Sequence, residues 1–151
     1  MEKFQEKYGN LIKLGKEGRF DAIVHGCNCK KNWGKGIAVT MKSAFFKAFL
    51  VDLNSTPRLG ELSICKEYEC CDIINAYTQI YPGRNKYGKD SDFNRYKAVT
   101  NCMIEINKQY KGKIVGLPLI ASGYAGLKWS KVKKIIKNEL IDCYVVIIHL
   151  K

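Results

Sequence analysis

The sequence has 151 residues, of which 46% are hydrophobic and 26% charged, and it carries a formal net charge of +12. This length and composition indicate one globular domain spanning 1–151 and exclude a disordered or fibrous chain. No apolar run approaches the roughly 20 residues that span a bilayer, and the first residues lack the apolar core of a signal peptide. We therefore expect a cytoplasmic protein without a membrane partner, in the host cytoplasm if a virus encodes it.

The excess of basic residues predicts an anionic partner, because a positive field attracts phosphates and nucleic acids. The lysines are scattered along the chain and form no basic arm, so a dedicated nucleic-acid-binding tail is not expected. A lysine-rich solvated surface is the alternative interpretation.

The seven cysteines are an odd number in a chain expected to be cytosolic, and most of them lie beside apolar residues. We expect them to be reduced and buried as small hydrophobic side chains. They lack the two spaced pairs typical of a zinc site, and only two histidines accompany them. The sequence therefore predicts no structural metal, and it indicates no cofactor.

The apolar pattern predicts six strands and three helices. The expected elements are, in chain order, strands 3–8 and 21–25, helix 36–53, strands 62–66 and 72–78, helix 93–110, strand 114–120, a helix beginning near Ser130, and strand 144–150. The connections are expected to be a turn at 9–10, an apolar continuation at 11–14, a loop or one helical turn at 15–20, and a long exposed loop at 81–92.

This order of elements determines the expected fold class. Strands that alternate with helices predict an α/β protein, a three-layer α/β/α sandwich around a central mixed, mostly parallel sheet. The last strand is apolar along its whole length, as expected for a strand covered on both faces of the sheet.

A glycine-bearing segment, residues 25–37, connects strand 21–25 to the following helix. Its glycines, Gly34 and Gly36, let the backbone approach an anion without an intervening side chain. The amides of such a loop and the positive end of the helix dipole attract phosphate. The segment lacks the third glycine of a dinucleotide fingerprint and the Gly-Lys-Ser/Thr of a Walker loop. An ordinary turn is therefore the alternative.

A second loop of small residues, 121–126, follows strand 114–120 and also precedes a helix. In open α/β sheets the ligand binds beyond the carboxyl ends of the strands. Two facing loops rich in amides suit two phosphates, so the pair of loops predicts a diphosphate ligand.

The residues of these loops resemble a known family. The run VHGCNC over 24–29, followed by WGKGIA over 33–38, is similar to the phosphate-loop signature of macro domains. The resemblance is strongest to the branch with phage and fungal ADP-ribose 1''-phosphate phosphatases, which carry a similar His-x-Cys-Asn-Cys run and Gly-x-Gly-Ile-Ala. It covers nearly the whole chain, because YGNL over 8–11, INAYTQ over 74–79 and PLIASGYAG over 118–126 also resemble family motifs.

The resemblance implies a macro domain fold that binds ADP-ribose. Asn10 would lie near the adenine, where many macro domains have an aspartate, so adenine selectivity would be looser. Asn28 would contact the distal ribose, and Tyr124 would lean over it. The full set of binding residues that it implies is Asn10, Leu11, Cys27, Asn28, Trp33, Gly34, Lys35, Gly36, Ile37, Thr78, Gln79, Ala121, Ser122, Gly123, Tyr124, Ala125 and Gly126.

The resemblance also suggests a catalytic residue. His25 stands where the phosphatase branch has a histidine suspected in catalysis, and an imidazole can orient water or protonate a leaving oxygen. The alternative is a buried histidine that bonds between strands. His149, in the last strand, is expected to be structural or exposed.

Another branch of the family removes ADP-ribose from proteins with a lysine and an aspartate. Gln79 and Ala125 stand at the matching positions in this chain. Neither side chain can form a Schiff base or act as a base, which argues against that chemistry here.

Three functions remain open. The first is hydrolysis of a phosphate or ADP-ribosyl bond at the distal ribose of ADP-ribose 1''-phosphate or a related conjugate. The second is a module that binds ADP-ribose, or an ADP-ribosylated protein or nucleic acid, without turnover. The third is a basic nucleic-acid-binding protein, which the lack of interleaved aromatic and basic residues disfavours. The sequence indicates no oligomeric state.

Overall fold

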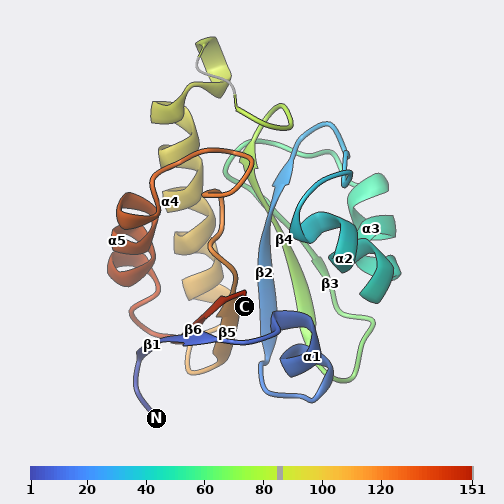
Figure 1. Cartoon of the computed structure of the whole chain (residues 1–151), viewed down its shortest axis with the longest axis vertical. Coiled ribbons are helices and arrows are strands. Elements are labelled where there is room, and N and C mark those ends of the chain that lie inside the picture. Colours follow the sequence, from blue (N-terminus) through green and yellow to red (C-terminus); the bar gives the residue numbers. More distant parts are fainter. Residues whose placement is uncertain (85–86, 151) are drawn as a thin grey trace.

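The computed structural model describes residues 1–84 and 87–150. Within these residues the chain forms six strands, five α-helices and one short 3₁₀ helix (Figure 1). In chain order they are β1 (Phe4–Tyr8), α1 (Leu11–Lys16), β2 (Ala22–Asn28), α2 (Ile37–Ala44), α3 (Phe46–Leu53), β3 (Leu62–Cys65), β4 (Asp72–Gln79), η1 (Gly88–Asp90), α4 (Asp92–Gln109), β5 (Ile114–Leu117), α5 (Trp129–Glu139) and β6 (Tyr144–His149).

The six strands form one sheet in the order β1-β6-β5-β2-β4-β3. Four neighbouring pairs run parallel, and β3 runs antiparallel to β4. The mixed, mostly parallel sheet expected from the sequence is thereby confirmed. The carboxyl ends of the five parallel strands lie at one edge of this sheet, which is where ligands bind in open α/β folds.

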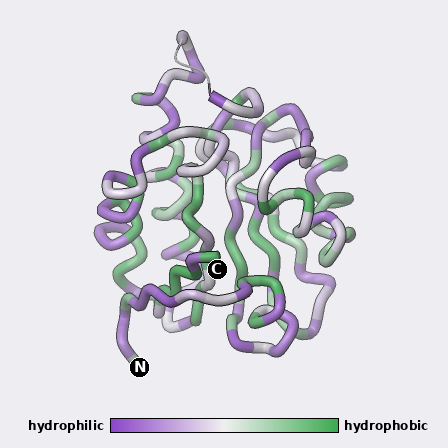
Figure 2. The backbone as a smooth tube through the Cα atoms, in the orientation of Figure 1, coloured by the Kyte–Doolittle hydropathy of each residue, from purple (hydrophilic) through white to green (hydrophobic). Residues whose placement is uncertain are grey.

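Helices cover both faces of the sheet. Figure 1 shows α4 and α5 on one side and α1, α2 and α3 on the other. Alternate residues of β2 therefore enter different cores: Ala22 and Val24 pack with α4 and α5, and Ile23 and Cys27 pack with α1 to α3. Figure 2 shows hydrophobic residues along the central strands and hydrophilic residues on the outer turns of α5. This confirms the three-layer sandwich.

The first helix is one of the elements that the sequence pattern did not predict. Asn10 begins it, and its side-chain oxygen accepts a hydrogen bond from the Lys13 amide at 3.0 Å. The helix has only 6 residues and contains Gly15, so no helical period can be recognised in it. The segments 11–14 and 15–20 are therefore largely one short helix rather than an apolar continuation and a loop.

The expected helix 36–53 is two helices, because the backbone leaves helical geometry at Phe45 (φ −133°, ψ 63°). The Phe45 ring is buried and contacts Tyr68 edge-on, with ring centroids 5.2 Å apart. Apolar residues continue across the break with the same spacing, so the periodicity does not reveal it. The break directs α3 and its carboxyl end toward the loop that follows β2.

The expected exposed loop 81–92 is partly ordered and partly buried. It contains η1, and Asp90 is buried. Residues 85 and 86 of this loop lie outside the described residues.

All seven cysteine thiols are free, and five of them are buried: Cys27, Cys65, Cys71, Cys102 and Cys143. This agrees with their expected role as reduced, mostly buried side chains. In the part of the chain that the structure describes, no helix has the length and apolar character needed to cross a membrane.

Candidate functional site

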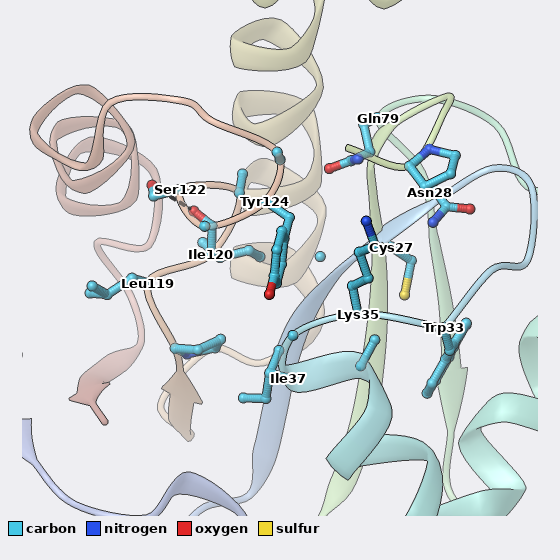
Figure 3. Close-up of a pocket in the computed structure, with 18 of the residues that line it drawn as sticks. Cys27, Asn28, Trp33, Lys35, Ile37, Gln79, Leu119, Ile120, Ser122 and Tyr124 are labelled. Atoms are coloured by element: carbon cyan, nitrogen blue, oxygen red, sulfur yellow. Dashed lines mark hydrogen bonds between the residues drawn. The ribbon is translucent and has the colours of Figure 1, made fainter. Parts of the chain in front are cut away.

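A pocket of about 890 Å³ opens beyond the carboxyl ends of β2, β4 and β5 (Figure 3). The first loop, residues 29–36, forms one wall, and the second loop, residues 118–127, forms the other. Its volume lies within the range of small-molecule sites, roughly 300–1,000 Å³. It brings together these residues expected from the sequence: Cys27, Asn28, Trp33, Gly34, Lys35, Gly36, Ile37, Gln79, Ala121, Ser122, Gly123, Tyr124 and Ala125.

Side-chain amides build the first loop. The Asn28 side-chain oxygen accepts hydrogen bonds from the amides of Lys30 at 3.0 Å and Asn32 at 3.2 Å, and its Nδ2 donates to the Asn32 carbonyl at 2.8 Å. The Asn32 side chain in turn accepts from the Gly34 amide at 2.9 Å. Asn28 lines the pocket as expected, but most of its hydrogen-bonding capacity holds the loop.

The two loops meet at Gly36 and Tyr124. Gly36 has φ +63°, a backbone conformation that favours glycine, and it caps the amino terminus of α2. A Cβ atom at this position would lie 3.2 Å from the Tyr124 ring. The amides of Ile37 and Ala38 belong to the first turn of α2, so they have no acceptor within the helix. This end of α2 is therefore suited to an anion.

Several carbonyl groups of the second loop accept hydrogen bonds from the protein. The carbonyls of Ala121 and Gly123 accept from amides within the loop at 3.1 and 3.0 Å, and the Ala125 carbonyl accepts from Arg95 at 3.2 Å. For the amides of Gly123, Tyr124 and Ala125, the described residues supply no acceptor. These amides can therefore donate to a ligand oxygen.

The electrostatic character of the pocket is positive. Its described lining residues include Lys35 but no aspartate or glutamate. The Lys35 ammonium lies 5.7 Å from the centre of the Tyr124 ring, which is 63% exposed. His149 also lines the pocket, but its Nε2 bonds to Glu6 at 2.8 Å. Such a pocket favours an anionic ligand.

The structure places His25, the expected catalytic residue, away from the pocket. Its side chain is 0% exposed, does not line the pocket, and lies on the side of the sheet that packs against α1 to α3. Its Nε2 bonds to the side-chain oxygen of Asn75 at 2.7 Å. Burial lowers the pKa of His25 to about 4, although Asn75 and the nearby Asp52 oppose the shift. A neutral, enclosed imidazole cannot reach a ligand in this conformation.

A pairing of His25 with a cysteine nucleophile is not supported either. Cys27 lines the pocket, and its sulfur lies 3.9 Å from Nδ1 and 3.7 Å from Nε2 of His25. Burial raises the pKa of the Cys27 thiol well above its ordinary value. The thiol is therefore protonated at neutral pH and is a poor nucleophile.

Four expected binding residues lie outside this pocket. Asn10 and Leu11 line a second cavity of about 1,470 Å³, which shares Tyr8, Gly36 and three other residues with the first. The two cavities therefore adjoin each other. The other two expected residues do not line either cavity: they are Thr78, which is buried, and Gly126.

Thr78 is buried at the register shift between β2 and β4. Within the described residues its hydroxyl has no hydrogen-bond partner. Gln79, one residue further on, lines the pocket and donates to the Tyr81 carbonyl at 2.7 Å. The register shift thus explains why neighbouring residues of the same expected motif have different surroundings.

Arg95 is a site-forming residue that the sequence reasoning missed. It is fully buried in α4 and pairs with Asp90 through bonds of 3.0 and 2.6 Å. It also donates to the carbonyls of Tyr81, Gly83 and Ala125. Its guanidinium therefore joins α4 to two segments of the pocket wall. The available signal was an arginine four residues before Val99, on the apolar face of the expected helix.

Other lining residues were also not expected. Tyr8 and His149 come from the ends of β1 and β6, and their rings lie 5.3 Å apart. The signal was topological, since both strands are parallel to β5 and end at the same edge of the sheet. In the described part of the chain, no group of three or more His, Cys, Asp or Glu residues is placed to hold a metal ion.

Comparisons with known proteins identify the fold. The macrodomain of Thermus aquaticus DarG superposes with a TM-score of 0.73 at 18% identity, over 98% of this chain and 97% of that one. Thermosipho africanus DarTG in complex with ADP-ribose superposes with a TM-score of 0.73 at 18% identity, over 95% of this chain and 40% of that one. The Trypanosoma brucei macrodomain in complex with ADP-ribose superposes with a TM-score of 0.71 at 14% identity, over 98% of this chain and 63% of that one.

Comparisons of sequence extend this result. No curated protein matches the chain. The family model described as Macro domain matches residues 24–136, which include the first loop, most of the sheet and the second loop. The chain therefore belongs to the macro domain family.

Proposed function

We propose that this chain is a single macro domain that binds ADP-ribose, with the diphosphate held between the first and second loops. The observation that carries the proposal is the pair of facing loops, whose amides at the start of α2 and at Gly123 to Ala125 have no acceptor among the residues that the structure describes. The absence of a carboxylate among the described lining residues supports an anionic ligand. Two structures of similar fold contain ADP-ribose.

The two adjoining cavities give the two halves of the ligand different surroundings. The adenosine half extends toward the second cavity, where Asn10 is located. The distal ribose lies beside Asn28 and below Tyr124, as the family resemblance implies. Because the Asn10 side-chain oxygen already accepts from Lys13, its Nδ2 is left to meet the adenine. This Nδ2 is a donor, so it can bond to a ring nitrogen of the base but is poorly suited to the adenine amino group, which is itself a donor. The contact therefore loosens selectivity for adenine.

Hydrolysis of ADP-ribose 1''-phosphate is the second candidate function, and Lys35 is the observation that favours it. The ammonium group lines the pocket at the first loop, where it can neutralise a phosphate on the distal ribose. The motifs VHGCNC and WGKGIA link the chain to the phosphatase branch. With His25 enclosed, this reaction would depend on positioning and electrostatic stabilisation of the departing phosphate. An ADP-ribose-binding module without turnover is the simpler alternative.

Two experiments test these proposals. In a ¹⁵N NMR titration, ADP-ribose should shift the amide signals of residues 35–38 and 123–125 more than those elsewhere. A uniform absence of shifts at millimolar ligand would contradict binding. Incubation with ADP-ribose 1''-phosphate and an assay for free phosphate then separates the enzyme from the binding module. Binding without phosphate release would leave the module as the function.

A further inference from the structure

We propose that Asp52, in α3, positions the first loop for its ligand through the indole of Trp33. The proposal rests on the proposed function, because it assigns a supporting residue to the loop that binds ADP-ribose. Asp52 is 0% exposed and does not itself line the pocket. It is therefore a positioning residue and makes no contact with the ligand itself.

Both oxygens of the Asp52 carboxylate are used. Oδ2 accepts a hydrogen bond from Nε1 of Trp33 at 2.8 Å, and Oδ1 accepts from the hydroxyl of Tyr77 at 2.6 Å. Tyr77 belongs to β4, in the sheet. The carboxylate thus connects the first loop to a rigid element of the fold, with α3 as the bridge.

The indole of Trp33 is fixed from several sides. It is 6% exposed, and its ring meets the rings of His25 and Phe49 edge-on, at centroid distances of 4.7 and 5.3 Å. Figure 3 shows Trp33 on the side of the first loop that lies away from Tyr124. Its backbone immediately precedes Gly34, the first of the loop's two glycines. A fixed indole therefore determines where the glycines and their amides lie.

Beyond residue 32, few other hydrogen bonds hold the first loop in place. In the described structure, the backbone from Trp33 to Gly36 makes one hydrogen bond as a donor, from the Gly34 amide to the Asn32 side chain. The carboxyl end of α3 supplies a second contact, because Lys31 donates to the Leu53 carbonyl at 2.8 Å. Neighbouring residues of α3 therefore hold the loop at two points.

A charged acceptor explains this arrangement better than general packing does. Burying a carboxylate costs free energy unless hydrogen bonds compensate it, and an apolar side chain would fill the same space without that cost. A carboxylate differs in that it directs a donor to one position. The bond from the indole to Asp52 thus gives the loop one defined conformation before the ligand arrives, which reduces the entropic cost of binding.

The test compares Trp33→Phe with Trp129→Phe, the same substitution at the chain's other tryptophan. Trp129 is half-buried at the start of α5 and does not line the pocket. Trp33→Phe keeps an aromatic ring but removes the donor to Asp52. We expect it to raise the Kd for ADP-ribose about tenfold, the equivalent of one charge-assisted hydrogen bond. Trp129→Phe should leave the Kd unchanged.

A measurement without ligand keeps this test independent of the proposed function. In the free protein, NMR order parameters of the amides from 33 to 36 should fall from about 0.85 to below 0.6 in Trp33→Phe. Asp52→Asn should lower the same values, and the double variant should add little to either single one, because both act through one bond. Unchanged order parameters in Trp33→Phe would overturn the positioning role. Failure of the wild type to bind ADP-ribose would instead overturn the proposed function.

Discussion

His25 and Asn75 face each other across neighbouring strands, and Nε2 of the histidine donates to the side-chain oxygen of the asparagine at 2.7 Å. The asparagine amide nitrogen donates to the Ala48 carbonyl and to Ser63 Oγ, each at 3.1 Å, so its oxygen is left as the acceptor. The proton of a neutral His25 is therefore on Nε2. The pair connects β2, β4 and α3 beneath the first loop.

This pair makes the stability of the protein depend on pH. The pKa of His25 falls from 6.5 to about 4 on folding, chiefly through burial. Its contribution is complete above pH 6.5, where the unfolded histidine is neutral, and is lost as the pH falls toward 4. We expect the free energy of unfolding to decrease by about 1.4 kcal/mol per pH unit below 6.5, and by about 3 kcal/mol in total.

Denaturant unfolding of the wild type and His25→Gln between pH 7 and 4.5 measures this effect. The variant should be less stable at pH 7 but should lose the dependence in this window. The carboxyls of Glu6 and Asp90 have pKa values below their ordinary range, so their contributions are lost at lower pH. If the free energy of unfolding depended on pH in the same way for both proteins, His25 would not be the group responsible.

Lys35 should determine the preference for a second phosphate. The wild type is expected to bind ADP-ribose 1''-phosphate about tenfold more tightly than ADP-ribose, because the ammonium meets the added charge. Lys35→Gln should bring that ratio close to one, because it weakens the binding of ADP-ribose less than the binding of ADP-ribose 1''-phosphate. Lys42→Gln is the control, since Lys42 lies over the Phe49 ring and does not line the pocket. A ratio unchanged by Lys35→Gln would remove Lys35 from the specificity of the site.

The buried ion pair of Arg95 and Asp90 should dominate the stability of the pocket wall. Arg95→Met removes the buried guanidinium from the Asp90 carboxylate, and breaking a buried ion pair in this way typically costs about 3–5 kcal/mol. Arg19→Met is a matched control, because Arg19 is exposed and its ion pair with Glu17 is long, at 3.9 Å. It should cost less than about 1 kcal/mol. Chemical denaturation of both variants tests the difference, and similar losses would contradict a structural role specific to Arg95.

The sequence predicted the sheet better than it predicted the site. All six strands were expected in order, because each carries a short apolar run between polar connections. The motif resemblance brought the two loops together correctly, since both follow parallel strands. It could not place His25, because the pattern does not show that helices cover both faces of this strand, so that only residues at its carboxyl end reach the pocket. Asp52 and Arg95 gave weak signals, since a charged residue inside a helical pattern usually faces solvent.

The net charge of +12 allows a direct test of the nucleic-acid alternative. If the basic surface only attracts a small anion, raising salt from 50 to 200 mM should weaken ADP-ribose binding modestly. A protein that contacts 6–10 phosphates of a nucleic acid would lose about 10³-fold or more over the same range. Tight, steeply salt-dependent binding of a plain oligonucleotide would favour the nucleic-acid-binding function instead.

The binding of ADP-ribose between the two loops is tested most directly at Gly123. This residue lines the pocket, and a Cβ atom there would meet no other atom within 4 Å, so the position can carry a side chain. Gly123→Glu adds a carboxylate beside the loop amides, and Gly123→Gln adds the same bulk without charge. Calorimetric titration should give about 100-fold weaker binding for Gly123→Glu than for Gly123→Gln, with similar melting temperatures. Equal affinities for ADP-ribose in the two variants would contradict a diphosphate held by the second loop.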